Sequence, residues 1–289
     1  MAPSSGHLRP ASAGACSESP REGSLSVVVP ARNEAANLVQ LVDEIVASCR
    51  LLCRQNAAGR PSSVRGFELL IVDDASMDET ASVLEQLRSA VPELRVLCLK
   101  ANAGQSAALL AGIRAAEGEW IATLDADLQN DPADLPRLWD ALGDHDAALG
   151  WRRIRRDRWS RRAVSRAANL IRNAVLKQSI RDTGCAIRIF RRADALTLPP
   201  FHGMHRFLGP LLLRQGCRVV QIAVNHRPRG HGRSHYNLWN RSWRVVIDLF
   251  GVAWLMRRAI RYEVVEPMKA GHTLTGRHHH HQPVQALSR

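Results

Sequence analysis

Apolar runs alternate with segments of helical periodicity in the first half of the 289-residue chain, and this alternation restricts the fold more than any other feature. Uninterrupted apolar strands are typical of sheets covered on both faces, and strand–helix alternation is typical of parallel sheets. The expected strands cover 25–29, 67–72, 94–99, 120–124 and, further on, 218–224. The expected helices cover 34–49, the region of 83–87, 104–116, a segment opened by Pro132, and 207–213. We therefore predict an α/β fold with a mostly parallel sheet and flanking helices.

The ends of the chain have a different composition from its middle. Residues 1–23 are rich in Ser, Ala, Gly and Pro and lack the apolar stretch of a signal peptide, so we expect a disordered leader. We expect the folded domain over 24–236, an amphipathic helix over 237–262 and a disordered tail over 263–289. One face of that helix would carry Trp239, Trp243, Ile247, Phe250 and Trp254. Its apolar stretch is shorter than the roughly 20 residues that a membrane span needs, so the helix would either lie on a membrane surface or pack its tryptophans against the folded domain.

The charge of the chain is divided unevenly along its length. Residues 1–150 contain 12 Lys and Arg against 21 Asp and Glu, a net charge of −9, whereas residues 151–289 contain 28 against 6, a net charge of +22. Eight arginines fall between positions 152 and 166. A strongly basic half indicates a polyanionic partner, which composition leaves open as nucleic acid, a phosphorylated substrate or an anionic membrane surface.

Several classes of protein are disfavoured by the motifs that the chain lacks. Its six cysteines include no Cys-x-x-Cys pair, which argues against a disulfide framework or a zinc ribbon and for reduced, cytosolic thiols. It also lacks G-x-G-x-x-G after a strand, the P-loop, H-E-x-x-H and G-x-S-x-G. A dinucleotide-dependent dehydrogenase, a P-loop ATPase, a zincin and a serine hydrolase are therefore disfavoured.

Two acidic clusters follow predicted strands. Asp125-Ala-Asp127 ends one strand, and the loop from Asp73 to Thr80 follows another. Paired carboxylates at a strand end suit a hard divalent cation that also binds a diphosphate, and ligands of open α/β sheets bind at the carboxyl ends of strands. Each cluster taken alone is equally compatible with turn formation or helix capping. Their occurrence at two strand ends of the same acidic half favours a binding site.

A series of motifs in the chain resembles the family 2 glycosyltransferases, which have the GT-A fold. The motifs of the acidic half are Pro30-Ala-Arg-Asn33-Glu34, the loop from Asp73 to Thr80, Asn102-Ala-Gly104, and Asp125-Ala-Asp127-Leu-Gln129 with Pro132. Those of the basic half are Gly150-Trp-Arg152, Arg161 with Ser165 and Asn169, Asp182-Thr-Gly184-Cys185, His205-Arg206-Phe207 and His226 to Tyr236. The second group is similar to dolichyl-phosphate mannosyltransferases and bacterial polyprenyl-phosphate glycosyltransferases. The resemblance covers about residues 24–260 in collinear order.

The resemblance implies a role for individual residues. Asp125 and Asp127 would be the catalytic carboxylates, with Asp127 and Gln129 binding Mg²⁺ or Mn²⁺. The nucleotide sugar would be bound by Pro30, Asn33, Glu34, Asp73, Asp74, Asp78, Asn102, Gly104, Asp125 and Arg152. The acceptor phosphate would be bound by Arg161, Ser165, Arg229 and Ser234.

The implied reaction is the inverting transfer of a sugar from a GDP- or UDP-sugar to polyprenyl phosphate, by a peripheral enzyme on the cytoplasmic face of a membrane and without nucleic acid. A divalent cation would stabilise the charge that builds on the departing diphosphate. The acceptor phosphate has a second pKa of about 6 and is already anionic at neutral pH, so it needs positioning by cations and no strong base.

Two other functions stay open at this point. A family 2 transferase that acts on a sugar hydroxyl would need a carboxylate base, for which Asp182 is the candidate in the basic half. A non-catalytic nucleic-acid-binding protein could use the arginine run, but its strand-end carboxylates would then repel phosphates unless a metal were bound.

Overall fold

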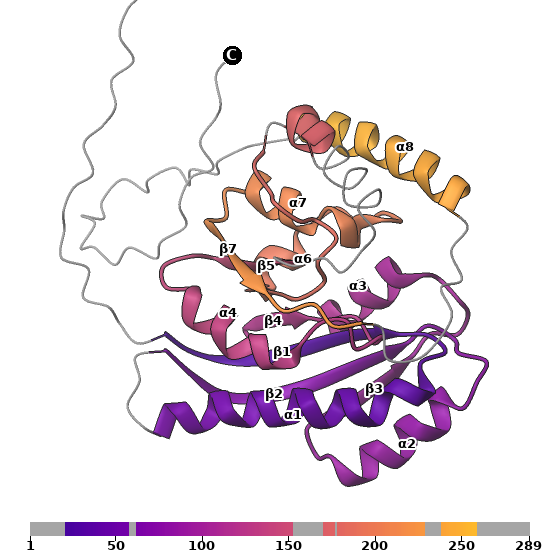
Figure 1. Cartoon of the computed structure of the whole chain (residues 1–289), viewed down its shortest axis with the longest axis vertical. Coiled ribbons are helices and arrows are strands. Elements are labelled where there is room, and N and C mark those ends of the chain that lie inside the picture. The colour runs from indigo at the N-terminus through magenta and orange to yellow at the C-terminus, as the bar shows by residue number, and fades with distance from the viewer. Residues whose placement is uncertain (1–20, 58–61, 153–169, 177, 229–237, 259–289) are drawn as a thin grey trace, which may run out of the picture.

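The computed structural model describes residues 21–57, 62–152, 170–176, 178–228 and 238–258. Its centre is a seven-stranded sheet with the order β3, β2, β1, β4, β6, β5, β7 (Figure 1). The strands are β1 (Arg21–Ala31), β2 (Ser62–Asp73), β3 (Leu94–Cys98), β4 (Trp120–Thr123), β5 (Ala147–Arg152), β6 (Arg188–Arg191) and β7 (Val219–Val224). Neighbouring strands are parallel except that β6 runs antiparallel to β4 and β5. The predicted mostly parallel sheet is thus confirmed.

All five strands expected from the sequence are present, and β5 and β6 were missed. β5 consists of small residues and an aromatic, Ala-Ala-Leu-Gly-Trp-Arg, which gives a weak apolar signal. β6 is four residues long and has an arginine at each end. Both strands depend on pairing with their neighbours, because the small residues of β5 and the terminal arginines of β6 give little strand propensity of their own.

β1 extends further in both directions than the sequence indicated. It begins at Arg21, inside the segment 1–23 that we assigned to the leader, and it continues through Pro30. The ladder between β1 and β4 ends at Val28, whose carbonyl oxygen accepts the N–H of Leu124. Residues two apart in a strand direct their backbone N–H groups to the same neighbour, so an N–H at Pro30 would point to the β4 side, as that of Val28 does. The ladder on that side has already ended at this point. The proline therefore costs the sheet no hydrogen bond.

The predicted helices are present. The helices of the structure are α1 (Ala35–Ala57), α2 (Thr80–Ala90), α3 (Gln105–Ala115), the 3₁₀ turn η1 (Pro132–Asp134), α4 (Leu135–Ala141), α6 (Arg192–Leu196), the 3₁₀ turn η2 (Met204–Arg206), α7 (Leu208–Arg214) and α8 (Leu238–Arg257). α1 runs to Ala57 instead of ending at 49, and α6 and the 3₁₀ turn η2 were not predicted. Residues 170–176 are also helical. The helix expected at Pro132 starts with one 3₁₀ turn, capped by Asp131, whose side chain accepts the N–H of Ala133.

Alternate residues of the central strands point to opposite faces of the sheet. Val27 and Leu69 belong to the apolar core that α1, α2 and α4 cover, whereas Val28 and Leu70 belong to the core that α3, α6, α7 and α8 cover. In Figure 1, α1 and α2 lie below the sheet and α8 lies at the opposite end of the molecule. Because both faces are covered, the strands appear in the sequence as continuous apolar runs.

Helix α8 is apolar on two faces. Leu249, Val252 and Ala253 are buried in the core beneath α7, so the helix is docked on the domain. Ile247, Phe250 and Trp254, from the face that the sequence indicated, are 52%, 63% and 60% exposed. The side chains of Trp239 and Trp243, which we placed on the same face, lie outside the described residues. Among the helices that the structure describes, none is both long and apolar enough to cross a bilayer.

Candidate active site

Three loops leave the sheet at the carboxyl ends of β1, β2 and β4, and each contains one non-glycine residue with a positive φ angle. The φ angles are 53° at Asn33, 55° at Ala75 and 61° at Leu128. No other non-glycine residue in the described part of the chain has a positive φ angle. A left-handed backbone is unfavourable for residues such as Ala and Leu, and such strain concentrates at functional sites. This edge of the sheet is therefore the candidate site.

The loops after β1 and β2 are hydrogen-bonded to one another. Asn33 Oδ1 accepts the N–H of Met77 at 2.8 Å, and the N–H of Asn33 donates to Ser76 Oγ at 2.9 Å. The N–H of Glu34 donates to Thr80 Oγ1 at 3.0 Å. The strained turn at Asn33 is therefore held by partners from a loop about 40 residues further along the chain. The arrangement places the Pro30 to Glu34 motif and the acidic loop side by side.

Asp73 and Asp78 form the acidic side of this pair of loops. Asp73 Oδ1 accepts the N–H of Ser76 at 3.1 Å and its hydroxyl at 2.5 Å. Asp78 accepts the N–H of Thr80 at 3.0 Å and that of Ala35 at 3.4 Å. Partial burial raises the pKa of Asp78, but these hydrogen bonds to its ionised form outweigh that effect, so its pKa is lowered. Asp78 thus joins the starts of α1 and α2 as an anion, the charge that helix N-termini favour.

Asp74 is engaged in holding the next loop. It is 4% exposed, and its carboxylate accepts the side-chain amide of Asn102 at 2.6 Å, the N–H of Ala103 at 2.7 Å and that of Gly104 at 2.9 Å. Asp74 therefore fixes the Asn102 to Gly104 loop at the start of α3. This geometry favours a role in shaping the site over the direct nucleotide contact that the resemblance implied for Asp74.

The Asp125 to Gln129 turn follows β4 at the centre of the edge. Gln105, at the start of α3, donates through Nε2 to Asp125 Oδ1 at 2.7 Å. Asp127 is 7% exposed, and its Oδ1 accepts the N–H of Gln129 at 3.2 Å. The turn brings two carboxylates and an amide oxygen to the end of one strand.

This donor set fits a divalent metal ion. Among the described residues, no group of three or more His, Cys, Asp and Glu side chains is arranged to hold a metal. Asp125, Asp127 and Gln129 would instead supply up to three oxygen ligands and leave the other positions to water and a diphosphate. Mg²⁺ prefers such a partly hydrated oxygen site, and Mn²⁺ accepts the same ligands.

A cavity of about 260 Å³ lies next to Asp125 and Pro30. Its walls carry two carboxylates and four guanidinium groups, from Asp125, Asp182, Arg152, Arg172, Arg188 and Arg206. The excess of cations suits the phosphate groups of a substrate. From the sequence, Asp125, Arg152 and Asp182 had candidate roles and Arg206 lay in a motif without an assigned role, whereas Arg172 and Arg188 were missed.

Arg152 and Asp182 form an ion pair in the wall of this cavity. Arg152 Nε lies 2.7 Å and Nη2 lies 3.0 Å from the two oxygens of the Asp182 carboxylate, which also accepts the N–H of Gly184 at 3.1 Å. The side chains are 18% and 5% exposed, respectively. A bidentate arginine and a backbone N–H stabilise the ionised carboxylate, so the geometry makes Asp182 a poor general base.

Arg188 is a buried member of the cavity wall. It is 6% exposed and donates to the carbonyl oxygens of Thr183 at 2.9 Å and His205 at 2.8 Å. Burial lowers the pKa of Arg188, and the nearby Asp125 and Asp182 act in the opposite direction. A signal for Arg188 was present in the sequence, because it interrupts an otherwise apolar run, Ile187-Arg-Ile-Phe.

A second cavity connects this region to α8. It shares Gln105, His205 and Arg206 with the first cavity, and its wall includes Ile247 and Asp248 from α8. Ser106 Oγ lies 2.7 Å from His205 Nδ1 and accepts the N–H of Gly203 at 2.9 Å, which fixes the turn that carries Arg206. The exposed face of α8 therefore begins beside the arginine-lined cavity.

Two further observations concern residues of the sequence motifs. Arg161, Ser165, Arg229 and Ser234, the residues that the resemblance assigned to the acceptor phosphate, lie outside the described residues. Cys185 is fully buried, and burial raises the pKa of its thiol to about 11. A protonated, buried thiol is not a nucleophile, so Cys185 is a packed side chain.

Comparison with known proteins identifies the family. A family model described as Glycosyl transferase family 2 matches residues 26–197. Dodecaprenyl-phosphate galacturonate synthase of Rhizobium johnstonii is 35% identical over 246 residues, which are 82% of this chain and 68% of that protein. Undecaprenyl-phosphate 4-deoxy-4-formamido-L-arabinose transferase of Edwardsiella ictaluri is 33% identical over 217 residues, which are 74% of this chain and 63% of that protein. The chain thus spans about two thirds of the length of these relatives.

A solved structure supports the fold. Glucosyl-3-phosphoglycerate synthase from Mycobacterium tuberculosis, in complex with Mn²⁺, UDP and glucosyl-3-phosphoglycerate, matches with a TM-score of 0.56 and 19% identity over 81% of this chain and 80% of that chain. At this identity the likeness concerns the fold alone, which is of the GT-A type. The extent of the family match and the identity to the relatives show that this chain belongs to glycosyltransferase family 2.

Proposed function

We propose that the protein transfers a sugar from a nucleotide-diphosphate donor to polyprenyl phosphate at a membrane surface, with Mg²⁺ or Mn²⁺ bound and with inversion at the anomeric carbon. The observation that carries the proposal is the shared wall of the two cavities. The arginine-lined cavity beside Asp125 adjoins a second one lined by α8, the helix with the exposed apolar face. A phosphate on a lipid needs this combination of a cationic cavity and an adjacent apolar surface. Both relatives are named after a polyprenyl phosphate, dodecaprenyl phosphate and undecaprenyl phosphate, which supports the same acceptor.

The donor would be bound at the strand ends. Asp127 and Gln129 would hold the metal ion, which supplies a Lewis acid for the charge that develops on the departing diphosphate. Asp125 is oriented by Gln105 at 2.7 Å and would contact the ribose or the metal shell. The nucleoside would lie along the hydrogen-bonded loops after β1 and β2, where Pro30, Asn33, Glu34, Asp73 and Asp78 stand, while Asp74 keeps Asn102 and Gly104 in place.

The acceptor would be bound by arginines. One phosphate oxygen attacks the anomeric carbon and forms the new C–O bond, while the bond between that carbon and the donor diphosphate breaks and its electron pair leaves with the diphosphate. The attacking phosphate is mostly ionised at neutral pH, with a second pKa of about 6, so no proton has to be removed. Arg152, Arg172 and Arg206 line the cavity in which it would be held against the negative donor. We propose that Arg161, Ser165, Arg229 and Ser234 complete this group.

A transferase that acts on a sugar hydroxyl is disfavoured by the state of Asp182. A hydroxyl acceptor requires a base to take its proton. Asp182, the candidate in the cavity, is bound by two nitrogens of Arg152 and by the N–H of Gly184. A carboxylate held in this way is a weak proton acceptor, whereas a phosphate acceptor does not need one.

The membrane contact would be made by α8. Ile247, Phe250 and Trp254 are more than half exposed, and Arg257 and Arg258 are exposed at the end of the helix. Aromatic and aliphatic side chains beside arginines suit the headgroup layer, and each interfacial cation adds about 1 kcal/mol on anionic lipid. Attachment of this kind is reversible and sensitive to salt.

Replacement of two exposed aromatic residues of α8 tests the membrane contact. The double variant Phe250→Ser/Trp254→Ser loses about 3 kcal/mol of apolar burial in the bilayer, so its partitioning should be on the order of 100-fold weaker than that of wild type. Flotation with phosphatidylglycerol vesicles at low salt measures the bound fraction. A matched control is Val39→Ser/Leu51→Ser on α1, where the side chains are 52% and 48% exposed but lie on the other face of the sheet. Equal flotation of both double variants would show that α8 is not the contact.

The acceptor class is tested by a panel of radiolabelled UDP- and GDP-sugars incubated with the protein, Mn²⁺ and vesicles that contain undecaprenyl phosphate. We expect label from one donor to enter the organic phase, and only when the polyprenyl phosphate is present. Label that stays in a water-soluble glycan, with no dependence on polyprenyl phosphate, would favour the hydroxyl acceptor and overturn the proposal.

A further inference from the structure

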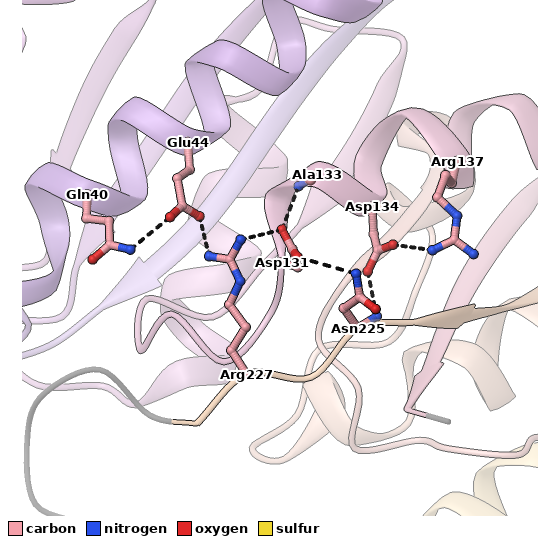
Figure 2. Close-up of polar contacts among 8 residues, drawn as sticks. All are labelled: Gln40, Glu44, Asp131, Ala133, Asp134, Arg137, Asn225 and Arg227. Atoms are coloured by element: carbon pink, nitrogen blue, oxygen red, sulfur yellow. Dashed lines mark hydrogen bonds and ion pairs between the residues drawn. The ribbon is translucent and has the colours of Figure 1, made fainter. Parts of the chain in front are cut away.

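Arg227 forms the centre of a cluster of ion pairs that adjoins the Asp125 to Gln129 turn. Its Nη1 lies 2.6 Å from Glu44 Oε2 on α1, and its Nη2 lies 2.7 Å from Asp131 Oδ1 at the start of η1. Figure 2 shows the guanidinium between these two carboxylates. The pairs join residues 183 and 96 positions apart in the sequence. One side chain therefore connects α1, the turn after β4 and the segment after β7.

The backbone around Arg227 is joined to the same turn. Its N–H donates to the carbonyl oxygen of Gln129 at 3.0 Å, and His226 forms an isolated antiparallel bridge with Asn130. Two residues before Arg227, Asn225 donates through its N–H to Asp134 Oδ2 at 2.7 Å (Figure 2). The segment after β7 thus lies along Gln129, Asn130 and Asp131. Gln129 is a proposed metal ligand, and Asn130 and Asp131 follow it directly in the sequence.

The charges make this contact more than a surface ion pair. The side chains of Arg227, Glu44 and Asp131 are 35%, 27% and 12% exposed. Partial burial lowers the pKa of Arg227, but the two carboxylates more than offset this effect, so its pKa is raised and it stays a cation. Without the guanidinium, Glu44 and Asp131 would face each other with no shared cation, and like charges repel. The turn that carries Asp131 would then move away from α1.

We infer that Arg227 is a positioning residue that holds the Gln129 to Asp131 turn in the geometry that binds the metal and the donor diphosphate. This inference rests on the proposed function for the metal itself. The guanidinium of Arg227 acts through the Asp131 carboxylate, 2.7 Å away and two residues after Gln129. The backbone N–H of Arg227, which a substitution would keep, holds the Gln129 carbonyl oxygen at 3.0 Å. Residues that orient metal ligands from behind typically change metal affinity 10–100-fold when they are replaced.

The test compares Mn²⁺ binding by three variants, measured as the electron paramagnetic resonance signal of free Mn²⁺ in the presence of UDP or GDP. Arg227→Ala should bind Mn²⁺ with the nucleotide on the order of 10–100-fold more weakly than wild type. Arg227→Lys should recover part of the loss. An ammonium keeps the charge but lacks the two terminal nitrogens with which the guanidinium reaches Glu44 and Asp131 together. Arg137→Ala is the matched control, because the Arg137 guanidinium binds the next acid, Asp134 at 2.5 Å, and the carbonyl oxygen of Ala223, whereas the Arg227 guanidinium binds Asp131.

The outcomes separate the inference from the proposed function. Wild-type Mn²⁺ affinity in Arg227→Ala, with wild type binding the metal normally, would overturn the inference alone. Absence of nucleotide-dependent Mn²⁺ binding by wild type would overturn the metal assignment on which it rests. A loss of affinity in Arg137→Ala equal to that in Arg227→Ala would show a general effect of loosening the domain. If Arg227→Ala does not fold, Arg227→Lys and Glu44→Gln carry the test, with weaker Mn²⁺ binding expected for both.

Discussion

Replacing Asp127 with alanine is expected to lower turnover on the order of 10³-fold and to remove metal-dependent donor binding. A metal ion that stabilises a departing diphosphate contributes several kcal/mol, and about 4 kcal/mol corresponds to a factor of about 10³ in rate. The fold should persist, because the hydrogen bond that Asp127 accepts from the N–H of Gln129 at 3.2 Å, within the described residues, contributes only about 1 kcal/mol. Turnover with and without a chelator, together with thermal unfolding, measures both parts of the prediction.

The matched control for this substitution is Asp144→Ala. Asp144 is an exposed aspartate before β5, at the edge of the sheet opposite to the site. It should keep wild-type turnover and the wild-type response to chelator. Full turnover by Asp127→Ala, or undiminished turnover by wild type in excess chelator, would contradict the metal assignment.

Asp182→Ala is expected to lower the free energy of unfolding by about 3–5 kcal/mol. Arg152 is 18% exposed and would lose its bidentate partner in the wall of the cavity, and removing one partner of a largely buried ion pair is strongly destabilising. Replacement of both partners, Arg152→Met/Asp182→Leu, removes the charges together and should recover most of the lost stability. Urea unfolding of the single and double variants gives the coupling between the two side chains.

An exposed ion pair provides the control for this prediction. Arg50 and Glu93 form a bond of similar length, 3.1 Å, but their side chains are 52% and 24% exposed. Glu93→Ala should therefore change the free energy of unfolding by less than about 1 kcal/mol. If Asp182→Ala unfolds at the same urea concentration as wild type while turnover is abolished, Asp182 acts as a base and the hydroxyl acceptor is favoured.

The sequence was sufficient to predict the class of the fold, and it pointed to the same edge of the sheet at which the structure gathers the candidate site. The central strands are buried on both faces, so consecutive residues such as Leu25 to Val29 are mostly apolar and identify the strand from the sequence. Carboxylates that directly follow a strand, such as Asp125 and Asp127, can likewise be recognised from neighbouring residues in the sequence. The collinear motifs indicated the family, which the comparisons confirmed.

The sequence was not sufficient for elements and roles that depend on partners far along the chain. β5 and β6 form because neighbouring strands pair with them, and their own residues give little signal. Asp74 has the same surroundings in the sequence as Asp73, yet its carboxylate is taken by the Asn102 to Gly104 loop. Residue type and spacing cannot show which oxygen is already bound.

Helix α8 and Arg227 show the same division between sequence and tertiary structure. Periodicity predicted an amphipathic helix and one apolar face, but packing of Leu249, Val252 and Ala253 decided that Ile247, Phe250 and Trp254 are the residues left exposed. Likewise, a basic residue in the motif after β7 is visible in the sequence, whereas its two carboxylate partners lie 183 and 96 residues away. Secondary structure follows from side chains a few residues apart, and the pairing of charges follows only from how the elements pack, because that packing brings distant residues within hydrogen-bond distance.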